Sequence, residues 1–542
     1  MKVNLSRILP FSLMPLLAAY AASYAIWEDA TGNLVTALHT GWGDLFFHIR
    51  AAIFFVEQGG IPQESFFLAG EPVGYAYLAD WISGIGWYLG MSLSYAFAIP
   101  TIILATITII VMQWLTWYIT RSAFAGIMST VLFMGFSGIS GWITLSTLIA
   151  NRSVSWWETL RALPYDITAW HDAHLVILNP FIMMLHQRAY LLGFPLLLLT
   201  LYAAYRYMVQ ARLYYLALVV VASVFTALAH PFTWAGLSLI LPSWMIWQSI
   251  LIKKYNKSDY AWAIAALAFI SIAGLLIVKH LQPSAGTPTI QWQVGWLAED
   301  MSWLVFWLKN IGLYAIAIPF AIYHLLRHHK PLATLTLASL TPFVAGNLFQ
   351  FSPWIWDNTK MFAPTWVIFA IATAATLGYF WETRHFWYQT VIVIIVPALI
   401  LSGLLEILRA VSYRSQPFTI HTAQEQLLGA QVRSITQPRD LILTEPVFSN
   451  PIFVYSGRPS LVAYEGWLWS QGWVGQYEQK IADTRLIYKG GDQARQLLQS
   501  YNIAYVSVGP PEVAAGANKQ WFDAHYPAAL VMNQYTLYKV SP

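Results

Sequence analysis

The stretch from Gly41 to Asp80 reads GWGDLFFHIRAAIFFVEQGGIPQESFFLAGEPVGYAYLAD. Two glycines interrupt the chain just before Asp44, and the apolar run 45–56 that follows has the length of a helix. Asp44 is well placed as an N-cap, because its carboxylate can accept hydrogen bonds from the free N–H groups of the first turn. His48 follows four residues later, so the two side chains share one helix face.

An apolar helix in a loop between two membrane spans is expected to lie along the membrane surface. We therefore predict an interfacial helix over residues 44–57, which would hold the carboxylate of Asp44 at the boundary between water and lipid. The plainer interpretation of the same pattern is a helix cap and a solvated histidine without a chemical role.

Composition places the chain among polytopic membrane proteins. Of its 542 residues, 58% are hydrophobic and only 10% are charged, whereas soluble proteins average about 25% charged residues. The 27 tryptophans and 30 tyrosines are typical of aromatic belts at two membrane interfaces. The lack of cysteine excludes disulfides and thiolate chemistry. No basic run or nucleic-acid motif occurs, so we expect no nucleic-acid partner.

Apolar runs predict about 13 membrane spans, within a range of roughly 11 to 13. Basic clusters place the N-terminus in the cytoplasm and the long loops outside. The family resemblance described below implies a bacterial cytoplasmic membrane. The first run is expected to be kept as a span, although it also resembles a signal peptide. Glycines interrupt 122–150, and parity favours two short spans there. The other predicted spans are 8–26, 74–92, 95–118, 189–205, 214–230, 232–251, 261–281, 303–325, 332–350, 362–381 and 387–408.

Two domains are expected, in a mainly α-helical fold. Residues 1–410 would form the transmembrane domain, with the first external loop at 27–73. In residues 411–542 the long apolar runs stop and charges rise, which indicates a small extracytoplasmic α/β domain. Its predicted strands are 441–444, 452–455, 503–508 and 536–540, and its predicted helices are 422–435 and 492–501.

Ionisable residues gather on the predicted outer side. Asp80 would lie inside the second span, where a carboxylate is a functional candidate, although pairing with a neighbouring span explains it as well. Loop 151–188 offers Glu158, Asp166 and His174. Its His171-x-x-His174 pattern, with Asp172, suits a metal, but this spacing is common by chance.

Two places suit a lipid phosphate. Gln187 and Arg188 precede a span, and the arginine fork can donate two parallel hydrogen bonds to phosphate. An interfacial arginine anchor is the alternative. Asp357 can cap a later span, and Lys360 follows one turn on. A lysine at a helix N-terminus opposes the helix dipole, so we expect a compensating anion nearby, for which a lipid phosphate would serve.

Together these features suit a substrate with a lipid tail and an interfacial phosphate. A single carboxylate such as Asp44 can act as general base on an acceptor hydroxyl, while cations stabilise the departing lipid phosphate. No nucleotide is needed, in keeping with the lack of a glycine-rich phosphate loop. A divalent cation, Mg²⁺ or Mn²⁺, is an open option and would require a second carboxylate near Asp44.

Short motifs along the chain resemble those of the GT-C class of integral-membrane glycosyltransferases. This class includes protein O-mannosyltransferases, aminoarabinose transferases and oligosaccharyltransferase catalytic subunits, and the similarity is to a bacterial and archaeal branch. Relatives often carry a histidine where this chain has Ala76. The matching motifs are GDLFFH at 43–48, GIP at 60–62, GEPVGYAYLAD at 70–80, NP at 179–180, QR at 187–188, WDNTK at 356–360, SGR at 456–458 and GWLWS at 466–470.

The resemblance implies a polyprenyl-phosphate-linked sugar donor and membrane lipids as partners. It makes Asp44 the base or the metal-binding carboxylate. The acceptor, on the outer face, stays open among a glycan, a lipid and a protein. The motifs and the residue analysis together give three further groups: His48, Tyr75 and Asp80 as supporting residues; Gln187, Arg188 and Lys360 as lipid-phosphate ligands; and Glu158, Asp166, His174, Trp356, Asp357 and Asn358 near the acceptor or behind the catalytic residues.

Two other functions remain in competition. A transporter or flippase for lipid-linked saccharides would show internal repeats and polar residues near the bilayer midplane, whereas here they gather at one face. A non-catalytic envelope-assembly scaffold would leave Asp44 and Asp80 as capping and packing residues. The aromatic run 466–469 also has two interpretations. Its rings can stack on sugar rings, or they can dock the outer domain on the membrane.

Overall fold

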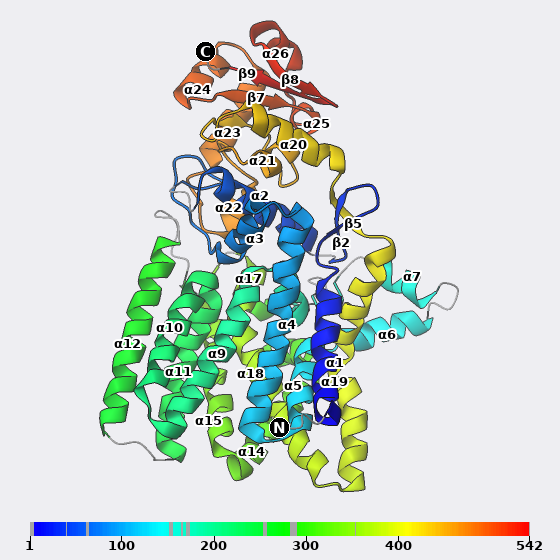
Figure 1. Cartoon of the computed structure of the whole chain (residues 1–542), viewed down its shortest axis with the longest axis vertical. Coiled ribbons are helices and arrows are strands. Elements are labelled where there is room, and N and C mark those ends of the chain that lie inside the picture. Colours follow the sequence, from blue (N-terminus) through cyan, green and yellow to red (C-terminus); the bar gives the residue numbers. More distant parts are fainter. Residues whose placement is uncertain are drawn as a thin grey trace.

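The computed structural model describes residues 5–38, 41–60, 64–150, 155–163, 166–169, 174–252, 257–281, 290–352 and 354–540. The helices stand side by side in a bundle, and the C-terminal region lies beyond one end of it (Figure 1). The predicted mainly α-helical class is confirmed. The helices of the bundle are α1 (Leu5–Ala22), α4 (Leu93–Thr120), α5 (Ala123–Gly135), α6 (Ser140–Ala150), α9 (Ala189–Gln210), α10 (Leu213–Ala229), α11 (Pro231–Leu251), α12 (Lys257–His280), α13 (Trp303–Ile311), α14 (Tyr314–His328), α15 (Lys330–Ala338), α16 (Leu340–Leu348), α18 (Ala363–Glu382) and α19 (Phe386–Ser412).

Among the described residues, six helices are long and apolar enough to cross a membrane, or up to eight if each of two bent pairs is one span. The predicted number of 13 spans is not confirmed. Helix α18 lies at the centre, with 94% of its most apolar segment buried, whereas α12 is buried over only 17% of its own. Since α12 is strongly apolar, its exposed surface is suited to lipid.

The two bent pairs explain how 122–150 departs from a simple span. Helices α5 and α6 meet at 68°, and α13 and α14 meet at 84°. The break between α5 and α6 lies against the end of α13. A Cβ atom on Gly138 would lie 1.9 Å from the carbonyl oxygen of Lys309, so only glycine permits this contact. The predicted division into two helices is confirmed, but α6 turns sideways from the bundle (Figure 1), and two spans are not established.

The predicted second span, 74–92, is wrong. Helix α3 (Leu78–Tyr88) has only 11 residues and lies across the end of the bundle with α2 (Gly41–Glu57), as Figure 1 shows. Gly84 allows this packing, because a Cβ atom there would stand 3.0 Å from the carbonyl oxygen of Ala52. Hydropathy cannot separate a short helix buried by protein from one buried by lipid, and this caused the error.

Helix α2 also differs from its prediction. It begins at Gly41, so Asp44 lies within the first turn rather than at the N-cap, where its charge still suits the helix dipole. Residues 45–55 are buried around the whole circumference of the helix, so other parts of the protein cover its apolar side chains. Its position along a membrane surface stays a prediction. It packs between the bundle and the C-terminal region, through a cluster that includes Phe47, Phe66, Phe453 and Trp473. A helix that is apolar on every side is a buried helix.

The C-terminal region contains a four-stranded sheet of order β6-β7-β9-β8, in which β6 and β7 are parallel and the other pairs antiparallel. Strand β5 instead pairs with β2 of the first loop, so the two regions share a sheet of order β1-β2-β5. The division of the chain at residue 410 stays a prediction. The elements are η4 (Tyr413–Ser415), β5 (Phe418–His421), α20 (Ala423–Ile435), β6 (Ile442–Leu443), α21 (Pro451–Ser456), α22 (Glu465–Ser470), α23 (Glu478–Lys489), α24 (Asp492–Ser500), β7 (Tyr505–Val508), α25 (Pro510–Ala514), α26 (Lys519–His525), β8 (Ala528–Met532) and β9 (Tyr535–Lys539).

Most elements predicted for this region are confirmed with shifted ends, but the strand at 452–455 is wrong. That segment is helix α21, because the Asn450 side chain accepts hydrogen bonds from the N–H groups of Ile452 and Phe453, and Pro451 occupies the first turn. The remaining elements are β1 (Trp27–Glu28), β2 (Leu34–Thr36), α7 (Trp156–Arg161), α8 (Pro180–His186), β3 (Gln291–Trp292), η2 (Trp296–Ala298), β4 (Phe349–Gln350), α17 (Ile355–Thr359) and η3 (Lys360–Phe362).

Candidate active site

Asp44 is held by a residue that lies 143 positions away in the sequence. Gln187, which ends helix α8, donates a hydrogen bond of 2.5 Å from Nε2 to Asp44 Oδ2. Helix α8 is anchored by Asn179, whose side chain accepts from the N–H groups of Phe181 and Ile182. The half-buried carboxylate therefore has a fixed orientation.

A buried chain of charges lies behind Asp44. His48 Nδ1 is 2.9 Å from Asp80 Oδ2, and Arg188 Nε donates to Asp80 Oδ1 at 3.0 Å. Arg188 also donates to the Thr101 and Ser83 hydroxyls and to the carbonyl oxygen of Ala79. His48, Asp80 and Arg188 are each no more than 2% exposed. Asp80 thus orients the His48 ring, and Arg188 neutralises Asp80.

This arrangement gives Arg188 a different place from the one expected. Its guanidinium donates hydrogen bonds to other groups of the protein. The pKa of Arg188 is lowered, because the effect of burial outweighs the opposing effect of Asp80. Arg188 lines neither of the two cavities described below. Direct contact between Arg188 and a lipid phosphate stays a prediction, and the contacts seen here are structural.

Lys360 lies beside an anion, as the sequence predicted. Its Nζ lies 2.6 Å from Asp357 Oδ1, so the anion that compensates this lysine here is the neighbouring carboxylate. Asn358 shapes the loop around the pair: its Oδ1 accepts from the N–H groups of Phe351 and Ser352, and its Nδ2 donates to the Ser352 and Trp354 carbonyl oxygens. The side chain of Trp356 lies outside the described part of the structure.

Two cavities meet at these residues. The α8 cavity, of about 370 Å³, extends toward Leu178, Met183 and His186. The α12 cavity, of about 220 Å³, extends toward Phe232 and Val278. Both are lined by the same six residues, which we call the shared wall: Asp44, Gln187, Asp357, Lys360, Trp467 and Ser470.

The shared wall brings several predicted residues together. His48 and Tyr75 line the α12 cavity beside it, and the pKa of Tyr75 is raised well above its usual value by burial and by Asp80. The tyrosine hydroxyl therefore keeps its proton and can donate. Asp166 lines the α8 cavity and lies 3.8 Å from Arg409.

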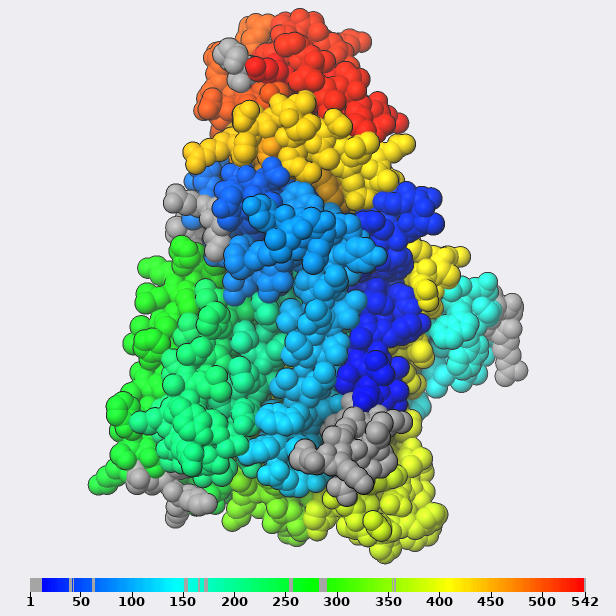
Figure 2. All heavy atoms as spheres, in the orientation of Figure 1, coloured from blue at the N-terminus to red at the C-terminus, as the bar shows by residue number. Residues whose placement is uncertain are grey.

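Other predicted residues lie elsewhere. Glu158 closes a capping box with Ser155 on α7, which projects from the side of the bundle (Figures 1 and 2). His174 groups with Glu299 and Asp300, with ligand atoms within 4.8 Å of one another. Among the described residues no other set of three acidic or histidine groups is this close, and Asp44 is not part of it. His171 and Asp172 lie outside the described residues.

Two residues of the shared wall come from the C-terminal region. Trp467 packs against Phe47 with ring centroids 5.3 Å apart, and the Ser352 hydroxyl donates to the carbonyl oxygen of Ser470 at 3.3 Å. The GWLWS motif was the only sequence signal for them. His186 was not selected from the sequence, because a single histidine before a span carries no pattern.

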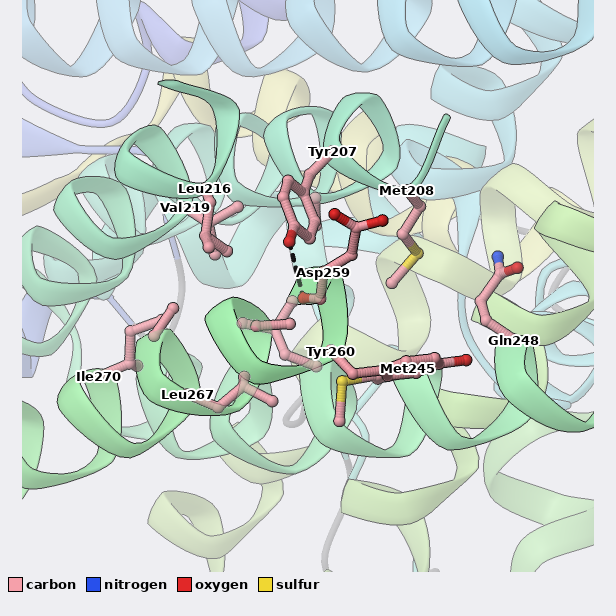
Figure 3. A pocket seen from close by; sticks show the side chains of 14 residues that line it. Tyr207, Met208, Leu216, Val219, Met245, Gln248, Asp259, Tyr260, Leu267 and Ile270 are labelled. Atoms are coloured by element: carbon pink, nitrogen blue, oxygen red, sulfur yellow. Dashed lines mark hydrogen bonds between the residues drawn. The ribbon is translucent and has the colours of Figure 1, made fainter. Parts of the chain in front are cut away.

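A third cavity, of about 50 Å³, lies between α9, α10, α11 and α12 (Figure 3). Most of its lining is apolar, and the Tyr207 hydroxyl donates to the carbonyl oxygen of Asp259 at 2.8 Å. None of the residues of the shared wall lines it. We therefore place the candidate site at the other two cavities.

The helical bundle, the buried loop helices and the C-terminal α/β region together have a fold that two solved structures share. They are ArnT from Cupriavidus metallidurans bound to undecaprenyl phosphate, with a TM-score of 0.52, and the same protein in the apo state, with a TM-score of 0.51. Identity is 9% in both, and coverage of each chain is 99% in the first case and 98% in the second. No protein-family model and no curated protein matches the chain. The likeness concerns the fold.

Proposed function

We propose that this integral-membrane protein is a glycosyltransferase. It moves a sugar from a polyprenyl-phosphate-linked donor to an acceptor hydroxyl at the outer face of a bacterial cytoplasmic membrane, where residues 411–542 form an extracytoplasmic domain. The observation that carries the proposal is that Asp44 and Lys360 both belong to the shared wall of two cavities. Such a transfer requires a base and a cation at the junction of two substrate spaces.

The α12 cavity suits the donor. It is bounded by Val278 of α12, the helix with the least buried apolar segment among the six long ones, so a polyprenyl tail can reach it from the bilayer. Lys360 then meets the phosphate, with Tyr75 as a further donor. The undecaprenyl phosphate in the solved ArnT structure supports a ligand of this class.

The α8 cavity is left for the acceptor. In the transfer step, Asp44 takes the proton of the acceptor hydroxyl. The oxygen of that acceptor hydroxyl then forms the new bond to the anomeric carbon of the sugar. The bond from that carbon to the phosphate oxygen breaks, and its electron pair leaves with the polyprenyl phosphate. Gln187 holds the Asp44 carboxylate in position, and Lys360 stabilises the charge on the leaving phosphate.

A divalent cation at Asp44 remains an option within this proposal. Asp357 lines both cavities with it, and Asp166 lines one, so either can supply a second carboxylate ligand. The check is the rate of transfer after treatment with EDTA and after re-addition of Mg²⁺ or Mn²⁺.

The test of the proposal uses the purified full chain in lipid nanodiscs. Undecaprenyl-phosphate-linked sugars are supplied with membrane extract as the source of acceptor, and the release of free undecaprenyl phosphate is measured. We expect release that depends on the protein and is lost in Asp44→Asn. If undecaprenyl phosphate does not bind the wild-type chain, the proposal is wrong.

A further inference from the structure

The α8 cavity is lined by aromatic rings from separate segments. Phe448 and Tyr464 have ring centroids 5.4 Å apart, Tyr464 and Trp467 are 5.7 Å apart, and Trp354 also lines the cavity. Such amphipathic rings offer flat apolar faces, which match the C–H faces of a sugar ring. Ligand sites typically combine such apolar walls with a few placed polar groups.

His186 is a buried polar group that a ligand in the cavity could hydrogen-bond. It lines the α8 cavity and is 3% exposed, and its Nδ1 makes no hydrogen bond of good geometry among the described residues. The backbone of Ile182 lies close enough to oppose the lowering of the His186 pKa. Burial, and to a lesser extent Lys360, lower that pKa, while the acidic groups Asp44 and Asp166 oppose this shift. The ring is therefore neutral, and a neutral imidazole both donates and accepts. A buried polar atom without a good hydrogen bond destabilises the fold, and a ligand in the cavity can supply the missing bond.

We propose that the α8 cavity binds a saccharide acceptor, with His186 hydrogen-bonded to a hydroxyl group and Tyr464 and Trp467 packed on the sugar ring. The inference rests on the proposed function and adds to it the chemical class of the acceptor. Asp44 lies on the wall of the same cavity, so a second hydroxyl of the bound saccharide is placed for deprotonation.

The lining favours a saccharide over a peptide. No strand edge lines the cavity in the described part of the chain, so an extended peptide would find no backbone ladder to join. The volume of about 370 Å³ falls in the range of roughly 300–1,000 Å³ typical of small-molecule sites. Carboxylates, an amide and an imidazole on the wall suit several neutral hydroxyl groups.

The experiment separates the two cavities by variants that touch only one of them. Full-length protein in nanodiscs is incubated with free mono- and disaccharides, and binding is read by saturation-transfer NMR. Binding of undecaprenyl phosphate is measured in parallel by native mass spectrometry. His186→Leu and Tyr464→Ala alter the α8 cavity, and Phe232→Ala is the matched control in the α12 cavity.

We expect the wild-type chain to bind at least one saccharide. His186→Leu and Tyr464→Ala should each weaken that binding about tenfold, as the loss of a hydrogen bond or a stacking contact implies, and leave lipid binding unchanged. His186→Asn keeps a donor and an acceptor, so it should recover part of the affinity. Phe232→Ala should weaken lipid binding and spare the saccharide.

Other outcomes overturn the inference. If the lipid binds but no saccharide does, the acceptor class is wrong while the donor assignment stands. If peptides with serine or threonine bind in place of sugars, the acceptor is a protein. If Phe232→Ala removes saccharide binding and His186→Leu does not, the cavities are assigned the wrong way round. Failure of undecaprenyl phosphate to bind the wild type defeats the proposed function itself.

Discussion

Gln187 Nε2 donates to Asp44 Oδ2 over 2.5 Å, across 143 positions of sequence. The bond joins the end of helix α8 to the first turn of α2, and both residues belong to the shared wall of the two cavities. The carboxylate proposed as the catalytic base is therefore oriented by a hydrogen bond from Gln187.

Asp44→Asn should reduce transfer by roughly 100- to 10,000-fold, which is the usual contribution of a general base. The asparagine side-chain oxygen can still accept from Gln187, so folding should be retained. The measurement is the initial rate of undecaprenyl phosphate release, with thermal unfolding as a check on folding. Asp492→Asn serves as the control, because the Asp492 side chain is 91% exposed and remote from both cavities. Fast transfer by the Asp44→Asn variant would show that another group takes the proton.

Lys360→Met should weaken binding of undecaprenyl phosphate about tenfold or more, since a hydrogen bond to a charged group contributes roughly 1.5–3 kcal/mol. Asp357→Asn should act in the opposite direction, because it removes the carboxylate that lies 2.6 Å from Lys360 Nζ. Titration of the lipid into nanodiscs measures both effects. Lys519→Met, at an exposed helix position, should change nothing. Equal affinities in all four proteins would rule out Lys360 as the phosphate ligand.

Arg188→Met should destabilise the fold, because it leaves Asp80 buried without its cation. Breaking a buried ion pair costs about 3–5 kcal/mol, and both side chains are 1% exposed. Thermal unfolding in detergent measures the loss, and Arg495→Met at an exposed pair provides the comparison. The double variant Arg188→Met, Asp80→Leu should recover much of the stability. If Arg188→Met instead unfolds normally and loses only lipid affinity, Arg188 is a phosphate ligand after all.

The C-terminal region should lose stability as pH rises. The pKa of Glu445 is raised above its ordinary value of 4.5, first by burial and then by Glu512, and burial likewise raises the pKa of Glu512. Above pH 4.5 the folded chain holds protons that the unfolded chain has released, so the free energy of unfolding falls until the folded pKa values are passed. Unfolding measured from pH 4.5 upward should show this slope.

Glu445→Gln should flatten that pH dependence, because an amide cannot ionise. Glu382→Gln, at an exposed helix end, should leave the slope as it is in the wild-type chain. A wild-type slope of the opposite sign would show that the carboxylates are stabilised as anions in the folded state.

Local patterns predicted much of this molecule. The apolar runs of α4, α9, α11 and α12 became helices, and the spacing of Asp44 and His48 places both on the α12 cavity. Contacts between residues far apart in sequence could not be predicted in this way. Arg188 pairs with Asp80, 108 positions away, and no local signal carries such a pair. Its binding of a lipid phosphate stays a prediction.

Strand β2 can pair with β5 only after residues 418–421 have been made. The roughly 380 residues between the two strands take on the order of 20–80 s to synthesise, at about 5–20 residues per second. Until then helix α2 lacks its cover from α21, and its apolar side chains must rest against the membrane surface or a chaperone. We therefore expect the newly made chain to lack the assembled site, and a nascent chain halted before residue 418 to hold Asp44 in an unassembled loop.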